Sequence, residues 1–209
     1  MDAPVAEPDA PPDEMEEPET PAPAVVAVVV SHNPGPWFEE TLAGLAGQDY
    51  PALSVLVIDA GSDADPAPRV AAVMPAAYVR RLDHNPGYGP ATNEVLEVVE
   101  GATFYLLLHD DVALAPDVVR LMVEEAYRSN AGIVGPKLVR WDDPQRLLQV
   151  GLSVDKLGVP SSPVEPGELD QEQHDAVRDV FVVPGACTLV RADLFAVLGG
   201  FDPGIPLLG

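Results

Sequence analysis

Short apolar runs alternate with amphipathic segments along most of this chain. The runs at 25–30, 54–58 and 104–108 are rich in Val, Ile and Leu, which is typical of strands buried on both faces of a parallel sheet. Apolar residues at helical spacing follow the first run, over 38–46, and the last run, over 117–129. Strand and helix in alternation predict right-handed crossovers, and therefore a Rossmann-like α/β fold whose mostly parallel sheet has helices on both faces.

Other segments give weaker signals. We expect a third parallel strand over 78–82 and a helix over about 91–99, just before the strand at 104–108. The second half of the chain predicts a strand that passes into a loop, a hairpin and two apolar strand pieces, over 132–141, 147–159, 180–183 and 187–190.

The first 24 residues form a separate region. They alternate Pro and Ala with Asp and Glu, contain no Lys or Arg, and include almost nothing that a core would bury. Such a segment cannot offset the entropy cost of ordering, so we expect residues 1–24 to be a disordered acidic leader and residues 25–209 to form one domain.

Charge and cysteine content exclude several partners. The formal net charge of −23 argues against nucleic acid or anionic lipid, because both require clustered Lys and Arg. The single Cys187 rules out an internal disulfide and a multi-cysteine zinc site, and it is compatible with a reducing compartment such as the cytoplasm. No apolar run has the length of a membrane span, and the acidic start does not resemble a signal peptide.

Polar clusters follow each of the predicted parallel strands. In open α/β sheets ligands bind beyond the carboxyl ends of the strands, and these clusters should lie along that edge. They therefore predict a nucleotide site, and their residues are Ser31-His32-Asn33, Asp59 to Ser62, His84-Asn85 with Gly87, and His109-Asp110-Asp111.

The pair Asp110-Asp111 suggests a divalent cation. Adjacent carboxylates at the mouth of a buried strand repel each other, and Mg²⁺ or Mn²⁺ shared with substrate phosphates would offset that repulsion. The alternative is that both residues simply open a loop before the helix that begins near Pro116. A second pair, Asp142-Asp143, precedes Pro144 and is better interpreted as a surface turn.

Five segments of the sequence, four in its first half and one in its second half, together resemble a known family. They occur in order and at suitable spacing, and they are similar to the inverting family 2 glycosyltransferases with the GT-A fold, particularly the rhamnosyl- and galactofuranosyl-transferase-like branch. The segments are Val26 to Asn33, Val57 to Ser62, His84 to Asn93, Leu106 to Val112, and Val183 to Arg191 with Gly199-Gly200-Phe201-Asp202.

The resemblance implies a role for each cluster at the donor site. Ser31 would belong to the nucleotide- and donor-binding residues, and Asp59 would accept a hydrogen bond from the nucleotide base. The loop with Asn85 and Gly87 would lie against the nucleotide sugar and diphosphate, and Asn93 would stand at the start of a helix whose positive end favours phosphate.

The carboxylates match the family's Asp-x-Asp motif. Asp111 takes the place of its last carboxylate, which is the principal ligand of Mn²⁺ or Mg²⁺, and Asp110 would point at the donor. His109 stands where the family has the first Asp, so it is a weaker metal ligand and lowers the negative charge of the site.

The resemblance also implies what lies outside the motifs. The donor would be a UDP- or dTDP-sugar and the acceptor a glycan or a lipid-linked hydroxyl compound. The family's general base is an acidic residue shortly after the segment Gly199 to Asp202, so we expect the base beyond Gly209 in a longer protein attached to the inner face of the plasma membrane.

Two other functions stay open. One is a non-catalytic GT-A-like module that binds nucleotide or glycan or serves as a scaffold. The other is a sugar-phosphate nucleotidyltransferase, which is disfavoured because the loop Ser31 to Pro36 carries no Lys or Arg.

Overall fold

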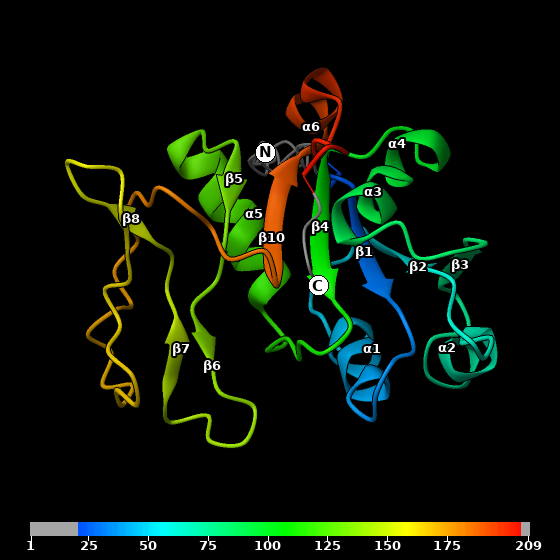
Figure 1. Ribbon diagram of the computed structural model, residues 1–209, viewed down its shortest axis with the longest axis horizontal. Coiled ribbons are helices and arrows are strands. Elements are labelled where there is room, and N and C mark those ends of the chain that lie inside the picture. Colours follow the sequence, from blue (N-terminus) through cyan, green and yellow to red (C-terminus); the bar gives the residue numbers. More distant parts are fainter. Residues whose placement is uncertain (1–20, 206–209) are drawn as a thin grey trace, which may run out of the picture.

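The computed structural model describes residues 21–205, and its centre is a six-stranded sheet in the order β3-β2-β1-β4-β10-β5 (Figure 1). The first four strands of the chain are parallel, and β10 runs antiparallel to both of its neighbours. This confirms the mostly parallel sheet that the apolar runs predict. The strands are β1 (Val25–Ser31), β2 (Leu53–Asp59), β3 (Tyr78–Arg81), β4 (Phe104–His109), β5 (Ile133–Val134) and β10 (Cys187–Arg191).

Helices cover both faces of this sheet. The helices are α1 (Phe38–Ala46), α2 (Ala67–Val73), α3 (Tyr88–Asn93), α4 (Val95–Val98), α5 (Val118–Ser129) and α6 (Ala192–Leu198). One core lies between the sheet and helices α1, α2 and α5, and a second core lies between the sheet and α3, α4 and α6. Because side chains alternate along a strand, Val29 belongs to the first core and Val30 to the second.

The predicted helix over 91–99 is wrong in its bounds. The chain forms two short helices there, and the first begins earlier, at Tyr88. Gly87 makes the early start possible, because it adopts a φ of 92° immediately before the helix.

The second half of the chain folds differently from the prediction. Residues 147–159 do not form one hairpin, because β7 (Leu147–Gln149) pairs with β6 (Leu138–Val139) and β8 (Ser153–Val154) pairs with β9 (Pro160–Ser161). The predicted strand piece at 180–183 is also wrong, since only Val182 makes a bridge, to Leu152.

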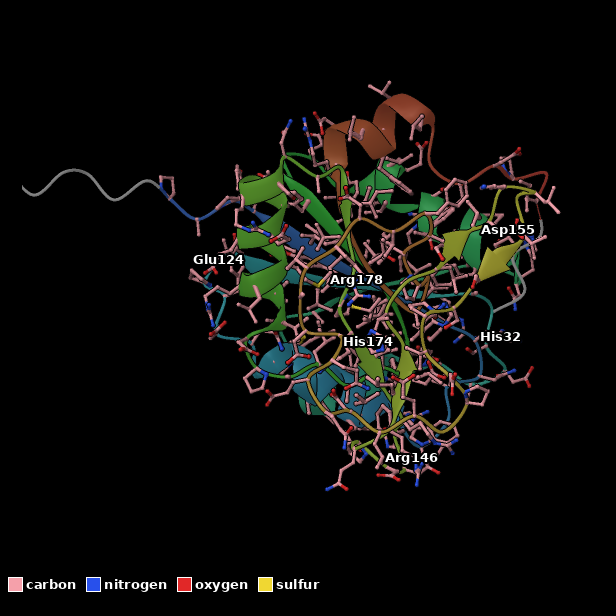
Figure 2. All side chains as sticks on the ribbon, turned by 90° about the vertical axis from the view of Figure 1, so that its left-hand side faces the viewer. His32, Glu124, Arg146, Asp155, His174 and Arg178 are labelled. Atoms are coloured by element: carbon pink, nitrogen blue, oxygen red, sulfur yellow. The ribbon has the colours of Figure 1, made fainter. Side chains whose placement is uncertain are left out.

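Side chains tie the segment that follows β9 to itself and to the strand pair β6–β7. Figure 2 views the molecule from this side and labels His174, whose Nε2 lies 3.1 Å from the Glu168 carboxylate. Lys137 forms ion pairs with Asp170 at 2.6 Å and with Asp175 at 2.5 Å. These polar contacts add to the packing of Leu138 against the first core and to the burial of Leu147.

The residues just before Val25 make contacts with the rest of the structure. Ala22 packs against the first core, the Pro23 carbonyl accepts a hydrogen bond from Tyr50 at 2.6 Å, and the Ala24 carbonyl accepts one from the Thr103 amide at 2.8 Å. Residues 22–24 thus contact the domain, and the division into a leader over 1–24 and a domain over 25–209 stays a prediction. The rest of that prediction, residues 1–20, lies outside the described residues.

Within residues 21–205, none of the helices combines the length and the apolar character that crossing a membrane requires.

Candidate functional site

The sheet reverses its strand order between β1 and β4. From β1 the chain proceeds to β2 and β3 on one side, and it then returns to place β4 on the other side of β1 (Figure 1). Such a switch point is where open α/β sheets bind ligands, in the crevice beyond the carboxyl ends of the strands. Ser31 ends β1, Asp59 ends β2 and His109 ends β4, so the predicted polar clusters do meet at this edge.

Ser31 and Asp59 are neighbours with unused hydrogen-bonding capacity. They are paired in the register of β1 and β2, and their exposed fractions are 2% and 0%. Asp59 Oδ1 accepts hydrogen bonds from the backbone amide and the hydroxyl of Ser62. Asp59 Oδ2 and Ser31 Oγ have no hydrogen-bond partner among the described residues. Leaving buried polar atoms unpaired is costly, so these two atoms are candidates for contact with a ligand.

Arg81 supports Asp59 and was missed by the sequence analysis. Its Nε lies 3.4 Å from Asp59 Oδ2, an ion-pair distance without a hydrogen bond, while Nη2 donates to the Ser62 carbonyl. The Arg81 guanidinium thus lies beside the fully buried Asp59 carboxylate, and its positive charge offsets part of the free-energy cost of burying that carboxylate. Arg81 ends β3, in register with Asp59, and only the pairing of β2 with β3 brings the two together.

The loop after β1 is fastened to the loop after β2. His32 Nδ1 lies 2.8 Å from the Ala60 carbonyl, and the Asn33 amide donates to Ser62 Oγ at 2.7 Å. Gly61 permits a close approach on the other side, because it has a φ of 67° and a Cβ there would lie 2.7 Å from the His84 backbone. The first predicted cluster is therefore joined to the second by hydrogen bonds between side chains and backbone, and the second lies against the backbone of the third.

Arg69 of α2 fixes the rest of the loop after β1. Its guanidinium forms two hydrogen bonds with the Glu39 carboxylate, at 2.6 and 2.7 Å, and donates to the carbonyls of Pro34 and Gly35, both at 2.7 Å. The same group lies over the Phe38 ring at 5.2 Å. Its charge also acts on the carboxylate of Asp110 at the end of β4.

The carboxylates after β4 occupy different environments. Asp110 is half-buried, and burial together with the neighbouring charge of Asp111 raises its pKa to about 6. Asp111 is exposed. Burial lowers the pKa of His109, so its imidazole is neutral at pH 7, and its ring packs edge-on against Tyr88 with a centroid distance of 4.6 Å.

These residues suit a cation that is shared with a ligand. No group of three or more His, Cys, Asp or Glu side chains within residues 21–205 is arranged to hold a metal by itself. Mg²⁺ is commonly bound by one or two carboxylates together with substrate phosphates, and an exposed carboxylate beside a half-buried one fits that mode. The raised pKa of Asp110 indicates a charge that the protein leaves without full compensation.

The loop after β3 differs in one respect from the prediction. The Asn85 side chain accepts a hydrogen bond from the Gly87 amide at 2.9 Å, which shapes the turn into α3. Asn93, however, is the last residue of α3 and not the start of a helix. Its amide group brackets the Phe201 backbone with two hydrogen bonds of 2.8 Å, so it joins α3 to the segment after α6.

The fold and the site define a class of protein before any particular relative is considered. A sheet with this strand order, a switch point between β1 and β4, and carboxylates at the ends of β2 and β4 is the GT-A type of α/β domain. The family model described as "Glycosyl transferase family 2" matches residues 26–199, and the chain belongs to that family.

A relative and two solved structures give the range of similarity. An N-acetylglucosaminyl-diphospho-decaprenol L-rhamnosyltransferase of Mycobacterium tuberculosis (strain H37Rv) is 31% identical over 199 residues, covering 84% of this chain and 64% of the relative. The chain thus spans less than two thirds of that protein.

The solved structures are more distant in sequence. The mannosyltransferase PcManGT from Pyrobaculum calidifontis, in complex with GDP-Man and Mn²⁺, has a TM-score of 0.61 at 22% identity, over 88% of this chain and 48% of its own. S. aureus TarS residues 1–349 in complex with UDP has a TM-score of 0.61 at 19% identity, and the match covers 88% of this chain and 51% of the TarS chain. Both share the fold of this chain.

Proposed function

We propose that this chain is the donor-binding domain of a glycosyltransferase that uses a UDP- or dTDP-sugar. One observation carries the proposal: Ser31 Oγ and Asp59 Oδ2 are buried, have no hydrogen-bond partner among the described residues, and belong to residues paired at the carboxyl ends of β1 and β2, next to the switch point. Asp59 Oδ2 can accept a hydrogen bond from a ligand, and the Ser31 hydroxyl can both donate and accept one. Uracil and thymine offer a matching N–H between two carbonyl groups.

The diphosphate would lie between the base site and the end of β4. Asp111 is the proposed principal ligand of Mn²⁺ or Mg²⁺, Asp110 faces the donor, and His109 contributes at most weakly. When bound, the cation supplies positive charge that stabilises the leaving diphosphate. Asn85 and Gly87 shape the loop that would contact the nucleotide sugar and diphosphate. Gly87 has a φ of 92°, and because it has no Cβ a ligand could approach its backbone closely.

The reaction is a displacement with inversion at the anomeric carbon by an acceptor hydroxyl. A general base must remove the hydroxyl proton as the oxygen attacks, and the acidic residue predicted for this role lies outside the described residues. The similarity to a rhamnosyltransferase whose name specifies a diphospho-decaprenol acceptor favours a lipid-linked glycan as the acceptor here. That acceptor would bring the protein to the inner face of the plasma membrane.

The test is calorimetric titration of UDP and dTDP into the protein, with and without Mn²⁺. We expect saturable binding that Mn²⁺ strengthens, and loss of the Mn²⁺ effect in Asp111→Ala. Asp142→Ala is the matched control, because Asp142 belongs to the second adjacent pair and its carboxylate already bonds to Arg140, at 2.9 Å through both oxygens. Absence of nucleotide binding, or a Mn²⁺ effect that survives Asp111→Ala, would contradict the proposal.

A further inference from the structure

Helix α1 lies along the segment that connects β4 to α5. We call residues 110–119 the carboxylate segment; it includes Asp110, Asp111 and the first two residues of α5. Thr41 Oγ1 of α1 lies 3.0 Å from the Asp110 carbonyl. Seven residues further along, Gln48 Nε2 donates to the Ala115 carbonyl at 2.8 Å.

Contacts at the far end of the segment are equally short. Gln48 Oε1 accepts a hydrogen bond from the Val119 amide at 3.0 Å, so one side chain bonds to the segment twice. The Asp49 amide donates to the Pro116 carbonyl at 2.8 Å. The segment is therefore held near its beginning by α1 and near its end by the two residues, Gln48 and Asp49, that follow the C-cap of α1.

The geometry of α1 and its end explains this arrangement. Thr41 and Gly44 lie on one face of α1, because they are three positions apart, and Gln48 follows directly after the C-cap Gly47. Between the two polar side chains lies Gly44, and a Cβ there would be 3.0 Å from the Leu114 amide nitrogen. The backbone of the segment thus rests directly against the helix, in the gap that Gly44 leaves.

We propose that Thr41 and Gln48 are positioning residues for the carboxylate pair. Residues 110–117 lie between β4 and α5 without regular secondary structure, so their backbone needs partners from elsewhere. Thr41 fixes the peptide that joins Asp110 to Asp111, and Gln48 fixes the backbone from Ala115 to the start of α5. This inference rests on the proposed function, because it gives the fixed backbone the task of aiming the two carboxylates at a cation and diphosphate.

Three variants test the proposal. Thr41→Val keeps the shape of the buried side chain and removes its hydroxyl, while Thr41→Ser keeps the hydroxyl and serves as the rescue. Gln48→Met keeps the length of the side chain and removes its hydrogen bonds. The matched control is Gln173→Met, because Gln173 also donates two side-chain hydrogen bonds, to Glu168 and the Leu169 carbonyl, and accepts one from the Gln171 amide, far from α1 in the sequence.

The first readout is UDP affinity in the presence of Mn²⁺. Since each lost hydrogen bond is worth about 1 kcal/mol, we expect the Kd to rise about five- to thirty-fold in Thr41→Val and Gln48→Met. Thr41→Ser and Gln173→Met should bind as the unmodified protein does. Binding without Mn²⁺ should change less, because the base site of Ser31 and Asp59 is untouched.

The second readout needs no ligand. Hydrogen exchange of peptides that span residues 110–119 should accelerate in Thr41→Val and Gln48→Met and stay unchanged in Gln173→Met. If exchange accelerates but the Kd with Mn²⁺ does not rise, the residues are only structural and the proposal is overturned. If exchange does not accelerate, Thr41 and Gln48 do not hold the segment. A protein that binds no UDP at all refutes the proposed function, and the exchange rates alone then show whether Thr41 and Gln48 fix the segment.

Discussion

Replacing Asp59 by Asn tests base recognition at a single atom. Asp59 Oδ1 already accepts two hydrogen bonds from Ser62, so the amide oxygen of Asn will take that position. The amide NH₂ then replaces Oδ2, the oxygen without a partner. A hydrogen-bond acceptor thereby becomes a donor at the point where the uracil N–H is proposed to bind.

The magnitude follows from the charge of the lost acceptor. A hydrogen bond to a charged group is worth about 1.5–3 kcal/mol, so the Kd for UDP should rise about ten- to 150-fold. Stability should change much less, by about 1 kcal/mol or less, because Arg81 is partly exposed and pairs with Asp59 at 3.4 Å without a hydrogen bond. Removing a buried charge also removes the cost of its burial, which opposes the loss of the ion pair.

The assay compares UDP with CDP by calorimetry. Cytosine presents an acceptor nitrogen where uracil presents N–H, so Asp59→Asn should weaken UDP binding and narrow the preference for UDP over CDP. Asp65→Asn is the matched control, because Asp65 belongs to the same loop and also approaches Arg81, at 3.7 Å, but is exposed. A folded Asp59→Asn protein with unchanged UDP affinity would refute the role given to Oδ2. If Asp65→Asn lost as much UDP affinity as Asp59→Asn, the effect would come from the change in charge alone.

Two further predictions concern the fold around the site. In chemical denaturation, Gly61→Ala should lower the free energy of unfolding by about 1–3 kcal/mol more than Gly101→Ala does. Both glycines have a positive φ, but of the two only Gly61 would bring a Cβ against backbone atoms, those of His84. Equal losses in the two variants would contradict this steric argument. Cys187 is fully buried, and burial raises the pKa of its thiol to about 12, so a thiol reagent at pH 8 should label it only as the protein unfolds; rapid labelling of the folded protein would contradict its burial.

The sequence predicts those parts of the fold that local patterns determine. The runs at 25–30, 54–58 and 104–108 correspond to β1, β2 and β4, because a strand buried on both faces requires continuous apolar residues. The positions of Ser31 and Asp59 at one sheet edge follow from the parallel order of these strands. The strand pairs β6–β7 and β8–β9 could not be predicted in the same way, since each strand is only two or three residues long.

The residues that support the site are harder to find in the sequence. Arg81 reaches Asp59 across a strand pairing, and Thr41 contacts a carbonyl 69 positions away. Neither residue belongs to a motif, and a lone Arg or Thr has no distinctive pattern. Asn93 illustrates the opposite error: its place after a Gly-rich loop predicted a role at a helix start, but its side chain pairs with the distant Phe201 backbone.

The position of His109 follows from the alternation of side chains along β4. His109 is in register with Val30, whose side chain belongs to the core on the α3 side of the sheet. It accordingly packs against Tyr88 of α3, whereas Asp110 follows the end of β4 and its carboxylate is affected by the charge of Arg69. A neutral, half-buried imidazole packs against a tyrosine ring at lower cost than a carboxylate would, because burial penalises the charged form. We therefore interpret His109, which stands in place of the family's first Asp, as a packing residue. We expect His109→Asn to lower the free energy of unfolding in chemical denaturation and to leave the strengthening of UDP binding by Mn²⁺ nearly unchanged in calorimetry.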